Sequence, residues 1–347
     1  MRIKRRKSRV IKIGNVRIGG DNPVVIQSMT KVKTSSVQEV VKQIKALECC
    51  GCEIVRLAVK DNEDALALKK IKSRVNLPLV ADIHFDWRLA IQAIESGVDK
   101  IRLNPGNISK REEIREVVCA AKANNIPIRV GVNSGSLIVG VEKSQVDAMV
   151  RRALDYIKIL EGFKFYEIVL SLKASNILDT VEAYRKISKL CDYPMHLGVT
   201  ATGSPNAGGI KSSVALGALL LEGIGDTLRV SLTEKPEAEV LAAKAILESL
   251  ELRNFGPEII SCPTCGRCEV DLVSIVRELE NRLSVVRIKR PVKIAVMGCV
   301  VNGPGEAKEA DIGVAFGKKD GLLFKKGKPV RKISVSECVN VLLRELR

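Results

Sequence analysis

Short apolar runs, rich in β-branched residues, recur along the first two thirds of the chain, each followed by a polar turn and a stretch with helical spacing. There are eight such runs, and they begin at Val24, Glu53, Pro78, Lys100, Pro127, Glu167, Met195 and Thr227. Each is too short for a helix, and its first half is apolar enough for burial on both faces, as in a parallel sheet covered by helices. Eight strands alternating with helices over about 230 residues predict a TIM (β/α)8 barrel.

The pattern changes after the last predicted barrel helix, near Gly256 and Pro257. The rest of the chain contains ISCPTCGRCE, a predicted helix over about 270–283, strands at KIAVMGC and DIGVAFG separated by a turn at NGPGE, a basic hairpin and a final helix. This order predicts a smaller α+β domain. We therefore expect a barrel domain over 1–254 and a second domain over 255–347. The long interval between the fifth and sixth strands, NSGSLIVGVEKSQV, is a candidate substrate loop.

The composition, with 46% hydrophobic and 28% charged residues, is typical of a globular enzyme. No apolar stretch approaches the roughly 20 residues of a membrane span, and the basic N-terminus is not followed by a signal-peptide core, so we expect a cytoplasmic protein that spans no membrane. The chain has ten cysteines, several of them clustered. Such clusters indicate metal or redox chemistry in a reducing compartment rather than a disulfide framework.

A net charge of +17 implies acidic partners. Nucleic acid, a phosphorylated small molecule and an acidic electron-carrier protein all satisfy that requirement, and the net charge does not choose among them. The positions of the charges are more informative.

Polar side chains recur where the predicted barrel strands end. Residues two apart on a barrel strand point the same way, and those near the carboxyl end face the active site. This rule selects Arg56, Asp82, His84, Arg102, Asn104, Arg129, Asn133, Ser171, Lys173, His196, Thr200, Arg229 and Ser231. Five inward cations would be costly to bury without counter-charge, and the planar fork of arginine matches phosphate oxygens. The pattern therefore predicts an anion site suited to a diphosphate.

Four cysteines in the second domain are the strongest chemical signal. Cys262, Cys265 and Cys268 are spaced by two residues each, and Cys299 follows a predicted strand. A CxxC pair lets two thiolates reach one metal site from a tight turn, and a ligand from a distant strand end completes it. From spacing alone both an iron-sulfur site and a zinc site remain open.

Several longer stretches carry a resemblance to a known family. They are SCPTCGR at Ser261, VMGCVVNGPGEAKEADIGVAFG at Val296, LLLEGIGDTLRVSLT at Leu219, and the strand ends IRLNPGN and ADIHFD. Over nearly its whole length the chain resembles the 4-hydroxy-3-methylbut-2-en-1-yl diphosphate synthases of the non-mevalonate isoprenoid pathway. The resemblance implies a homodimer of TIM-barrel chains with one 4Fe-4S cluster each, the cluster domain of one chain lying over the barrel of the other.

The resemblance also implies an activity and its partners. The reaction is the reductive ring opening of 2-C-methyl-D-erythritol 2,4-cyclodiphosphate to 4-hydroxy-3-methylbut-2-enyl diphosphate with loss of water, and ferredoxin or flavodoxin supplies two electrons. It assigns the cluster to Cys262, Cys265, Cys299 and Glu306, so Cys268 drops out of the set that spacing suggested. Three thiolates and a weaker carboxylate leave one iron open to a substrate oxygen.

The resemblance further assigns roles in the barrel. Its diphosphate contacts fall on residues already selected by strand position, namely Arg56, Arg102, Arg129, Asn133, Lys173, Arg229 and Ser231, and we place His196 beside them. The catalytic candidates are Glu306, His84 and Asp82.

One departure from the family pattern concerns acid-base chemistry. The family usually has glutamate after HLGVT, thought to assist proton transfer, where this chain has Ala201. The proton would then come from water or from a neighbour such as His84, or the step would be impaired.

Two rival hypotheses remain at this point. One is a nucleic-acid-binding protein with a structural zinc, which the basic hairpin favours and the scarcity of aromatic residues disfavours. The other keeps the barrel and cluster but acts on another phosphorylated substrate, as a dehydratase would. We expect a small diphosphate substrate and no nucleic-acid partner.

Overall fold

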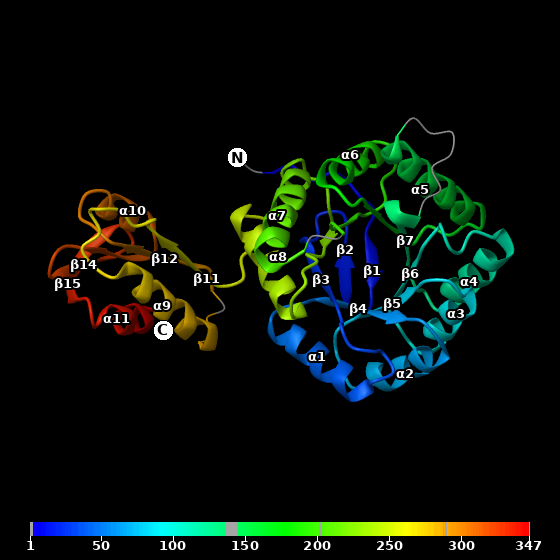
Figure 1. The fold of residues 1–347 in the computed structure, drawn as a ribbon, viewed down its shortest axis with the longest axis horizontal. Coiled ribbons are helices and arrows are strands. Elements are labelled where there is room, and N and C mark those ends of the chain that lie inside the picture. The colour runs from blue at the N-terminus through cyan, green and yellow to red at the C-terminus, as the bar shows by residue number, and fades with distance from the viewer. Residues whose placement is uncertain (1–2, 137–143, 201–202, 287, 289, 347) are drawn as a thin grey trace. The chain divides into compact units, whose positions relative to one another are not determined.

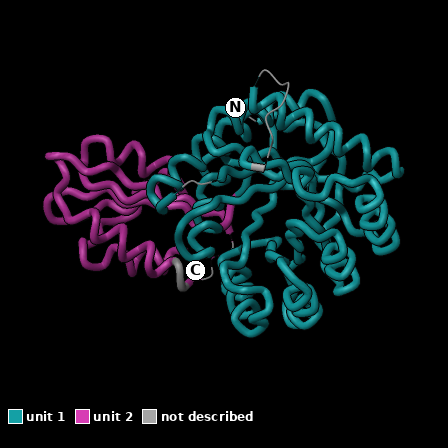
Figure 2. The backbone as a smooth tube through the Cα atoms, turned by 45° about the vertical axis from the view of Figure 1, so that its right-hand side comes forward, with its two compact units in different colours: residues 1–253 teal, residues 254–347 magenta. Residues whose placement is uncertain are grey.

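The computed structural model describes residues 3–136, 144–200, 203–286, 288 and 290–346. The chain divides into two compact units, residues 1–253 and 254–347, which Figure 2 shows in teal and magenta. Half of the predicted substrate loop, residues 137–143, lies outside the described residues, and so does Ala201.

The first unit is built on eight parallel strands. They are β3 (Val25–Met29), β4 (Ile54–Val59), β5 (Leu79–Ile83), β6 (Lys100–Leu103), β7 (Ile128–Asn133), β8 (Ile168–Lys173), β9 (His196–Leu197) and β10 (Thr227–Leu228). The sheet order is β8-β7-β6-β5-β4-β3-β10-β9, and a parallel bridge between Leu170 and Met195 joins β8 to the residue before β9. The sheet therefore closes on itself, and the predicted TIM barrel is confirmed.

In the described part of the first unit, eight helices follow the strands, and Figure 1 shows them as a ring outside the strands. They are α1 (Val37–Cys49), α2 (Asn62–Lys72), α3 (Trp87–Glu95), α4 (Arg111–Ala123), α5 (Gln145–Gly162), α6 (Ile177–Ser188), α7 (Pro205–Leu221) and α8 (Pro236–Ser249). Helical spacing sets the buried faces: α1, for example, buries Val40, Ile44 and Leu47. In the part of the chain that the structure describes, no helix is long and apolar enough to cross a membrane.

A short antiparallel hairpin precedes the barrel, and it was not predicted from the sequence. It pairs β1 (Ile11–Ile13) with β2 (Val16–Ile18). Its buried isoleucines pack against Val25 and Ile54, the first residues of β3 and β4. The turn needs Gly14, which has a φ of +57° and on which a Cβ would lie 2.8 Å from Asp99 Oδ1. The hairpin covers the amino end of the barrel, so polar residues inside can be reached from the carboxyl end.

The second unit is a five-stranded mixed sheet with helices on both faces. Its elements are β11 (Pro257–Ser261), α9 (Leu272–Val285), β12 (Val292–Met297), α10 (Gly303–Glu309), β13 (Ile312–Phe316), β14 (Asp320–Lys325), β15 (Lys328–Ser334) and α11 (Cys338–Glu345). The strands follow one another in order; β11, β12 and β13 are parallel, and β14 and β15 are antiparallel additions. The predicted α+β architecture is confirmed.

Two apolar layers hold the second sheet. The side chains of α9 and α11 pack on one face, around Val296 and Val314, and α10 packs on the other through Ala307 and Ala310. The sequence prediction of a turn at NGPGE was wrong, because residues from Gly303 onward form α10 with Pro304 in its first turn, where proline is tolerated.

Candidate active site

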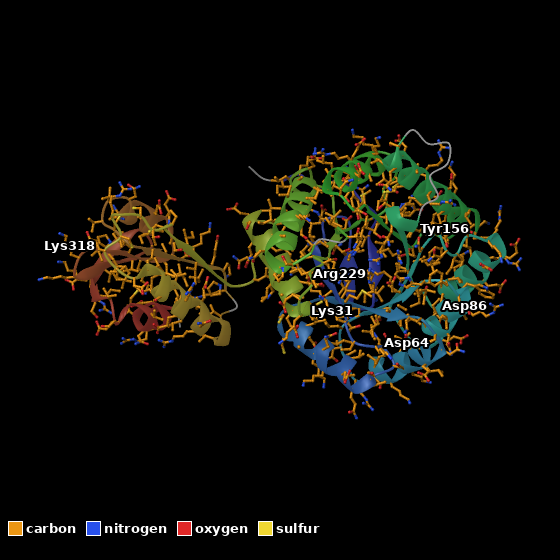
Figure 3. All side chains as sticks on the ribbon, viewed as in Figure 1. Lys31, Asp64, Asp86, Tyr156, Arg229 and Lys318 are labelled. Carbon is orange, nitrogen blue, oxygen red and sulfur yellow. The ribbon has the colours of Figure 1, made fainter. Side chains whose placement is uncertain are left out.

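The structure brings the five predicted barrel cations together inside the first unit. Arg56, Arg102, Arg129 and Lys173 lie on β4, β6, β7 and β8, and Arg229 directly follows β10. Arg129 is 1% exposed, Arg102 4% and Lys173 5%. Burial lowers the pKa of Lys173 well below its usual value, and Arg56, Arg129 and Arg229 lower it further. The five groups therefore lie close enough together for their charges to repel one another. Figure 3 shows Arg229 inside the ring of helices.

Asp82 is the main counter-charge in this space. Its carboxylate lies 3.3 Å from Arg102 Nη1, 3.7 Å from Arg56 Nε and 3.2 Å from His84 Nε2. Burial acts to raise the pKa of Asp82, but Arg56, His84 and Arg102 outweigh it and hold that pKa well below its usual value. Asp82 is therefore ionised, and it ties the half-exposed His84 to the buried cations.

A second carboxylate, Glu239, was missed in the sequence. It is 1% exposed on α8 and lies 3.1 Å from Arg229 Nη2 and 2.9 Å from Lys31 Nζ. Its Oε1 also accepts a hydrogen bond from the backbone of Leu232 at 3.0 Å. The available signal was a glutamate on the apolar face of a helix, beside the buried Val240.

Donors outnumber acceptors in the barrel lumen. Arg129 Nε and Nη1 and His196 Nε2 are buried and have no hydrogen-bond partner among the residues that the structure describes. His196 Nδ1 lies 2.8 Å from Thr227 Oγ1. Burial, with Arg129 and Lys173 close by, lowers the pKa of His196 well below its usual value, so the ring is neutral. The unpaired Arg129 nitrogens are buried donors, an unfavourable arrangement that an anion would satisfy.

Two glycines leave room for the cations. A Cβ on Gly131 would lie 2.4 Å from Arg102 Nε, and one on Gly198 would lie 2.6 Å from Lys173 Nζ.

Asn133 ends β7, and Ser231 is two residues beyond Arg229; both are half-buried.

Lys100 adds a sixth buried cation that was not selected in the sequence. It is fully buried, and its Nζ lies 3.4 Å from Gln27 Oε1. Burial lowers its pKa well below the usual value, and Arg129 and Arg56 lower it further. Lys100 precedes Arg102 by two residues and points the same way, but it begins β6 at the amino end, where the rule for carboxyl-end residues does not select it.

The predicted cysteine site is a cavity of about 300 Å³ in the second unit. It lies where β11 and β12 end and α10 begins, and it is lined by Cys262, Pro263, Thr264, Cys265, Arg267, Met297, Gly298, Cys299, Asn302, Gly303 and Glu306. Cys268 does not line it: its Sγ hydrogen-bonds to Val270 O at 3.2 Å and packs against the core of the sheet. Its position agrees with its omission from the ligand set that the resemblance implies.

Two thiols of this cavity, Cys265 and Cys299, have lowered pKa values. Hydrogen bonds from the backbone and side chain of Arg267 lower the pKa of Cys265, and backbone hydrogen bonds at Val301 and Asn302 lower that of Cys299. Thr264, between the first two cysteines, has a φ of +57°, a costly conformation for a β-branched residue.

Three soft thiolate donors and one carboxylate fit an iron-sulfur cluster in kind. Within the described ranges, however, no group of three or more His, Cys, Asp or Glu side chains is already close enough to hold a metal ion. The donors share one cavity, but they do not yet converge on one point.

Known proteins match both units. A family model described as the GcpE TIM-barrel domain matches residues 8–244, and one described as the GcpE protein C-terminal domain matches residues 258–347. A 4-hydroxy-3-methylbut-2-en-1-yl diphosphate synthase (flavodoxin) from Fusobacterium nucleatum is 54% identical over 99% of this chain and 96% of its own length. The synthase of the same name from Lawsonia intracellularis is 55% identical over the same shares.

Several solved structures are similar to the barrel of this chain. The dihydropteroate synthase of Stenotrophomonas maltophilia aligns with a TM-score of 0.54 and 13% identity, covering 70% of this chain and 98% of its own. That of Yersinia pestis gives a TM-score of 0.51 and 10% identity over the same shares. At such low identity these matches concern the fold alone. The family models and the relatives, by contrast, span both units at high identity, and the chain belongs to the GcpE family of iron-sulfur oxidoreductases.

Proposed function

We propose that this chain converts 2-C-methyl-D-erythritol 2,4-cyclodiphosphate into 4-hydroxy-3-methylbut-2-enyl diphosphate in isoprenoid biosynthesis, by reductive ring opening with loss of water. The relatives named above are synthases of that product. The observation that carries the proposal is the barrel lumen, where buried cations outnumber the two carboxylates and Arg129 has unpaired donors. A diphosphate supplies the missing charge and acceptors.

The substrate-binding residues in this proposal are the five barrel cations with their polar neighbours, namely Arg56, Arg102, Arg129, Asn133, Lys173, His196, Arg229 and Ser231. The arginines bind phosphate oxygens through paired N–H groups, and the neutral His196 offers a nitrogen without adding charge. Asp82 fixes the direction of His84 through their 3.2 Å contact. His84 is 42% exposed, so it can exchange protons with solvent and hold one at Nε2 for the reaction.

We assign one 4Fe-4S cluster to each chain, held by Cys262, Cys265, Cys299 and Glu306. The cluster supplies the two electrons and, at the iron held by Glu306, a Lewis acid. Arg267 and the backbone at Val301 and Asn302 favour the thiolate forms that such ligation needs. Glu306 is thus both ligand and catalytic residue in this proposal.

Flavodoxin is the electron donor that the relatives' names specify, and we propose it here. We also propose a homodimer in which the cluster domain of one chain lies over the barrel of the other. An exposed apolar stripe on α7 supports self-association: Ile210 is 66% exposed, Val214 56% and Leu221 58%. Several exposed free cysteines suit a reducing compartment such as the cytoplasm.

The test is an anaerobic assay of the iron-reconstituted chain with the cyclic diphosphate and dithionite. We expect a brown protein with about four irons and four sulfides per chain, and formation of the linear diphosphate. A colourless protein that holds one zinc, or a reconstituted protein that leaves this substrate intact but converts another phosphorylated compound, would overturn the proposal. Ala201→Glu is assayed in parallel, and activity in this variant alone would mean that Ala201 disables the proton-transfer step.

A further inference from the structure

The positive charge of the second unit is concentrated in one segment. Residues 318–332 contain seven basic residues and a single acidic one, Asp320. The structure describes this whole segment: Lys325 pairs with Glu345 at 2.7 Å, and the other six cations have no ion pair there. An unpaired basic edge strand deters sheet-to-sheet aggregation, but that role does not require the cations in the turn before β14.

That turn lies beside the cysteine cavity. It is closed by a 2.8 Å hydrogen bond from Gly317 N to Asp320 O, with Lys318 and Lys319 at its tip. A Cβ on Gly317 would lie 3.5 Å from Val300 Cγ1, so the turn borders the residue that follows Cys299. Lys318 extends away from the sheet into solvent (Figure 3).

The same place exposes apolar surface. Val300 and Val301 are each 61% exposed, although they directly follow a cavity-lining cysteine. Two adjacent exposed valines flanked by unpaired lysines have the composition of a small protein interface, with an apolar centre and a charged rim. Weak redox complexes typically have small interfaces.

We propose that Val300, Val301, Lys318 and Lys319, which we call the docking surface, receive an acidic electron-carrier protein. This inference rests on the proposed function, because it assumes that iron in the cavity accepts electrons. In each encounter the carrier loses one electron and that iron gains it, and no bond forms or breaks. Charge complementarity favours an acidic protein: the lysines speed its approach, and the valines provide the short contact beside Cys299.

The chain offers a matched control at the other end of the same hairpin. Lys326 and Lys328 lie at the β14–β15 turn, where the backbone of Lys325 is opposite that of Lys328. Lys318 and Lys319 lie at the other end of β14, where the backbone of Phe316 is opposite that of Gly321. Reversing either pair changes the net charge by the same amount. Comparison of the double variants Lys318→Glu/Lys319→Glu and Lys326→Glu/Lys328→Glu therefore distinguishes a local contact with the carrier from a general effect of the chain's net charge.

Two measurements use purified flavodoxin as the acidic probe. Titration of oxidised flavodoxin gives the dissociation constant for the chain with and without iron, and stopped-flow absorbance gives the rate of reduction by flavodoxin hydroquinone without substrate. We expect Lys318→Glu/Lys319→Glu to weaken binding and slow reduction about tenfold at low ionic strength, with the difference shrinking at about 0.5 M salt. The distal variant should stay within about twofold, and turnover with dithionite should stay unchanged in both.

Several results would overturn the docking surface. Equal effects of the two variants, or none, would mean a non-local field or another docking site. If Lys318→Glu/Lys319→Glu no longer bound a single-stranded RNA probe but still bound flavodoxin, the lysines would be assigned to nucleic-acid binding. If the same variant caused a dimer to dissociate in sedimentation, the surface would be assigned to contact with a second copy of the chain. Absence of turnover with both reductants would overturn the proposed function instead, whereas flavodoxin binding to the iron-free chain still tests the docking surface.

Discussion

The charged groups of the barrel and the donor groups of the cysteine cavity differ in burial. In the barrel, Asp82 and Glu239 are almost fully buried and form ion pairs of defined geometry. In the second unit, Cys265 and Glu306 are exposed along the wall of the cavity. The barrel groups are fixed by strands that pair in register: Asp82 lies beside Arg102, and Arg102 beside Arg129. The cavity groups come from a turn, a strand end and the start of a helix.

The difference concerns when each site acquires its geometry. Buried cations on paired strands cannot rearrange without a large energetic cost, so we expect the barrel to be organised for the proposed anion before the anion binds, at a cost in stability. Exposed thiols on turns can still move, so we expect the cavity to acquire its final geometry when the proposed metal binds, as metal sites that couple binding to folding do. The first site should therefore be sensitive to charge and the second to ligand identity.

The largest effect is expected from removing a cavity thiol. In Cys299→Ser, iron content should fall and turnover should drop at least about a thousandfold, or ~4 kcal/mol, because the electron path is lost. Anion binding in the barrel should be unchanged, as measured by calorimetric titration with pyrophosphate. Cys268→Ser is the control, since that thiol faces the core. Equal iron loss in both variants would contradict the assignment.

Removing the main counter-charge of the barrel should come next. Asp82→Asn leaves Arg56 and Arg102 buried without their carboxylate, so the free energy of unfolding should fall by about 3–5 kcal/mol. Urea denaturation measures this change, and added pyrophosphate should restore part of it by binding the folded state. An unchanged denaturation midpoint would mean that the lumen cations do not depend on Asp82.

Removing a cation with unpaired donors should have opposite effects on binding and stability. Arg129→Met should weaken pyrophosphate binding about a hundredfold, or ~2.7 kcal/mol, and raise the free energy of unfolding by about 1–3 kcal/mol. Calorimetry and urea denaturation measure the two effects. Arg115→Met, at an exposed position on α4, should change neither. Loss of both binding and stability would indicate a structural role.

The smallest effect is a pH dependence at His196. Its pKa in the folded chain lies well below the usual 6.5, so below pH 6.5 the unfolded chain binds a proton that the folded chain does not. Stability should therefore fall as the pH falls, by up to ~1.4 kcal/mol per pH unit from this residue. Urea denaturation at about pH 7.5 and 5.5 should show a shallower fall in His196→Gln. Parallel curves would mean that His196 is protonated when folded.

The sequence was sufficient for the barrel because its strands are buried on both faces and read as apolar runs. The run at Met195 became only the two-residue β9, yet its spacing still placed His196 inside the barrel. The β1–β2 hairpin was missed although IKIGNVRI alternates around a Gly-Asn pair, a recognised hairpin signal. Its strands have only three residues each, fewer than the apolar runs that indicate barrel strands.

The candidate site was predictable where chemistry follows strand position and less so elsewhere. The rule that residues two apart on a strand point the same way selected the five cations. It says nothing of Glu239, which reaches the lumen from a helix outside the barrel. The same rule could not separate Cys268 from the other cysteines, because the direction of the Cys268 side chain depends on how the chain turns toward Val270. Side chains on irregular segments require tertiary structure, because no fixed period sets their direction.

The hairpin that covers the amino end of the barrel has a kinetic consequence. Ile11, Ile13 and Ile18 seal that end, so a diphosphate enters and leaves by the same mouth. In the proposed function the linear product keeps the diphosphate that the lumen cations would bind, so it would have to depart before the next substrate arrives. If the lumen binds the diphosphate as proposed, we expect competitive product inhibition, and product release is a natural candidate for the slow step of turnover.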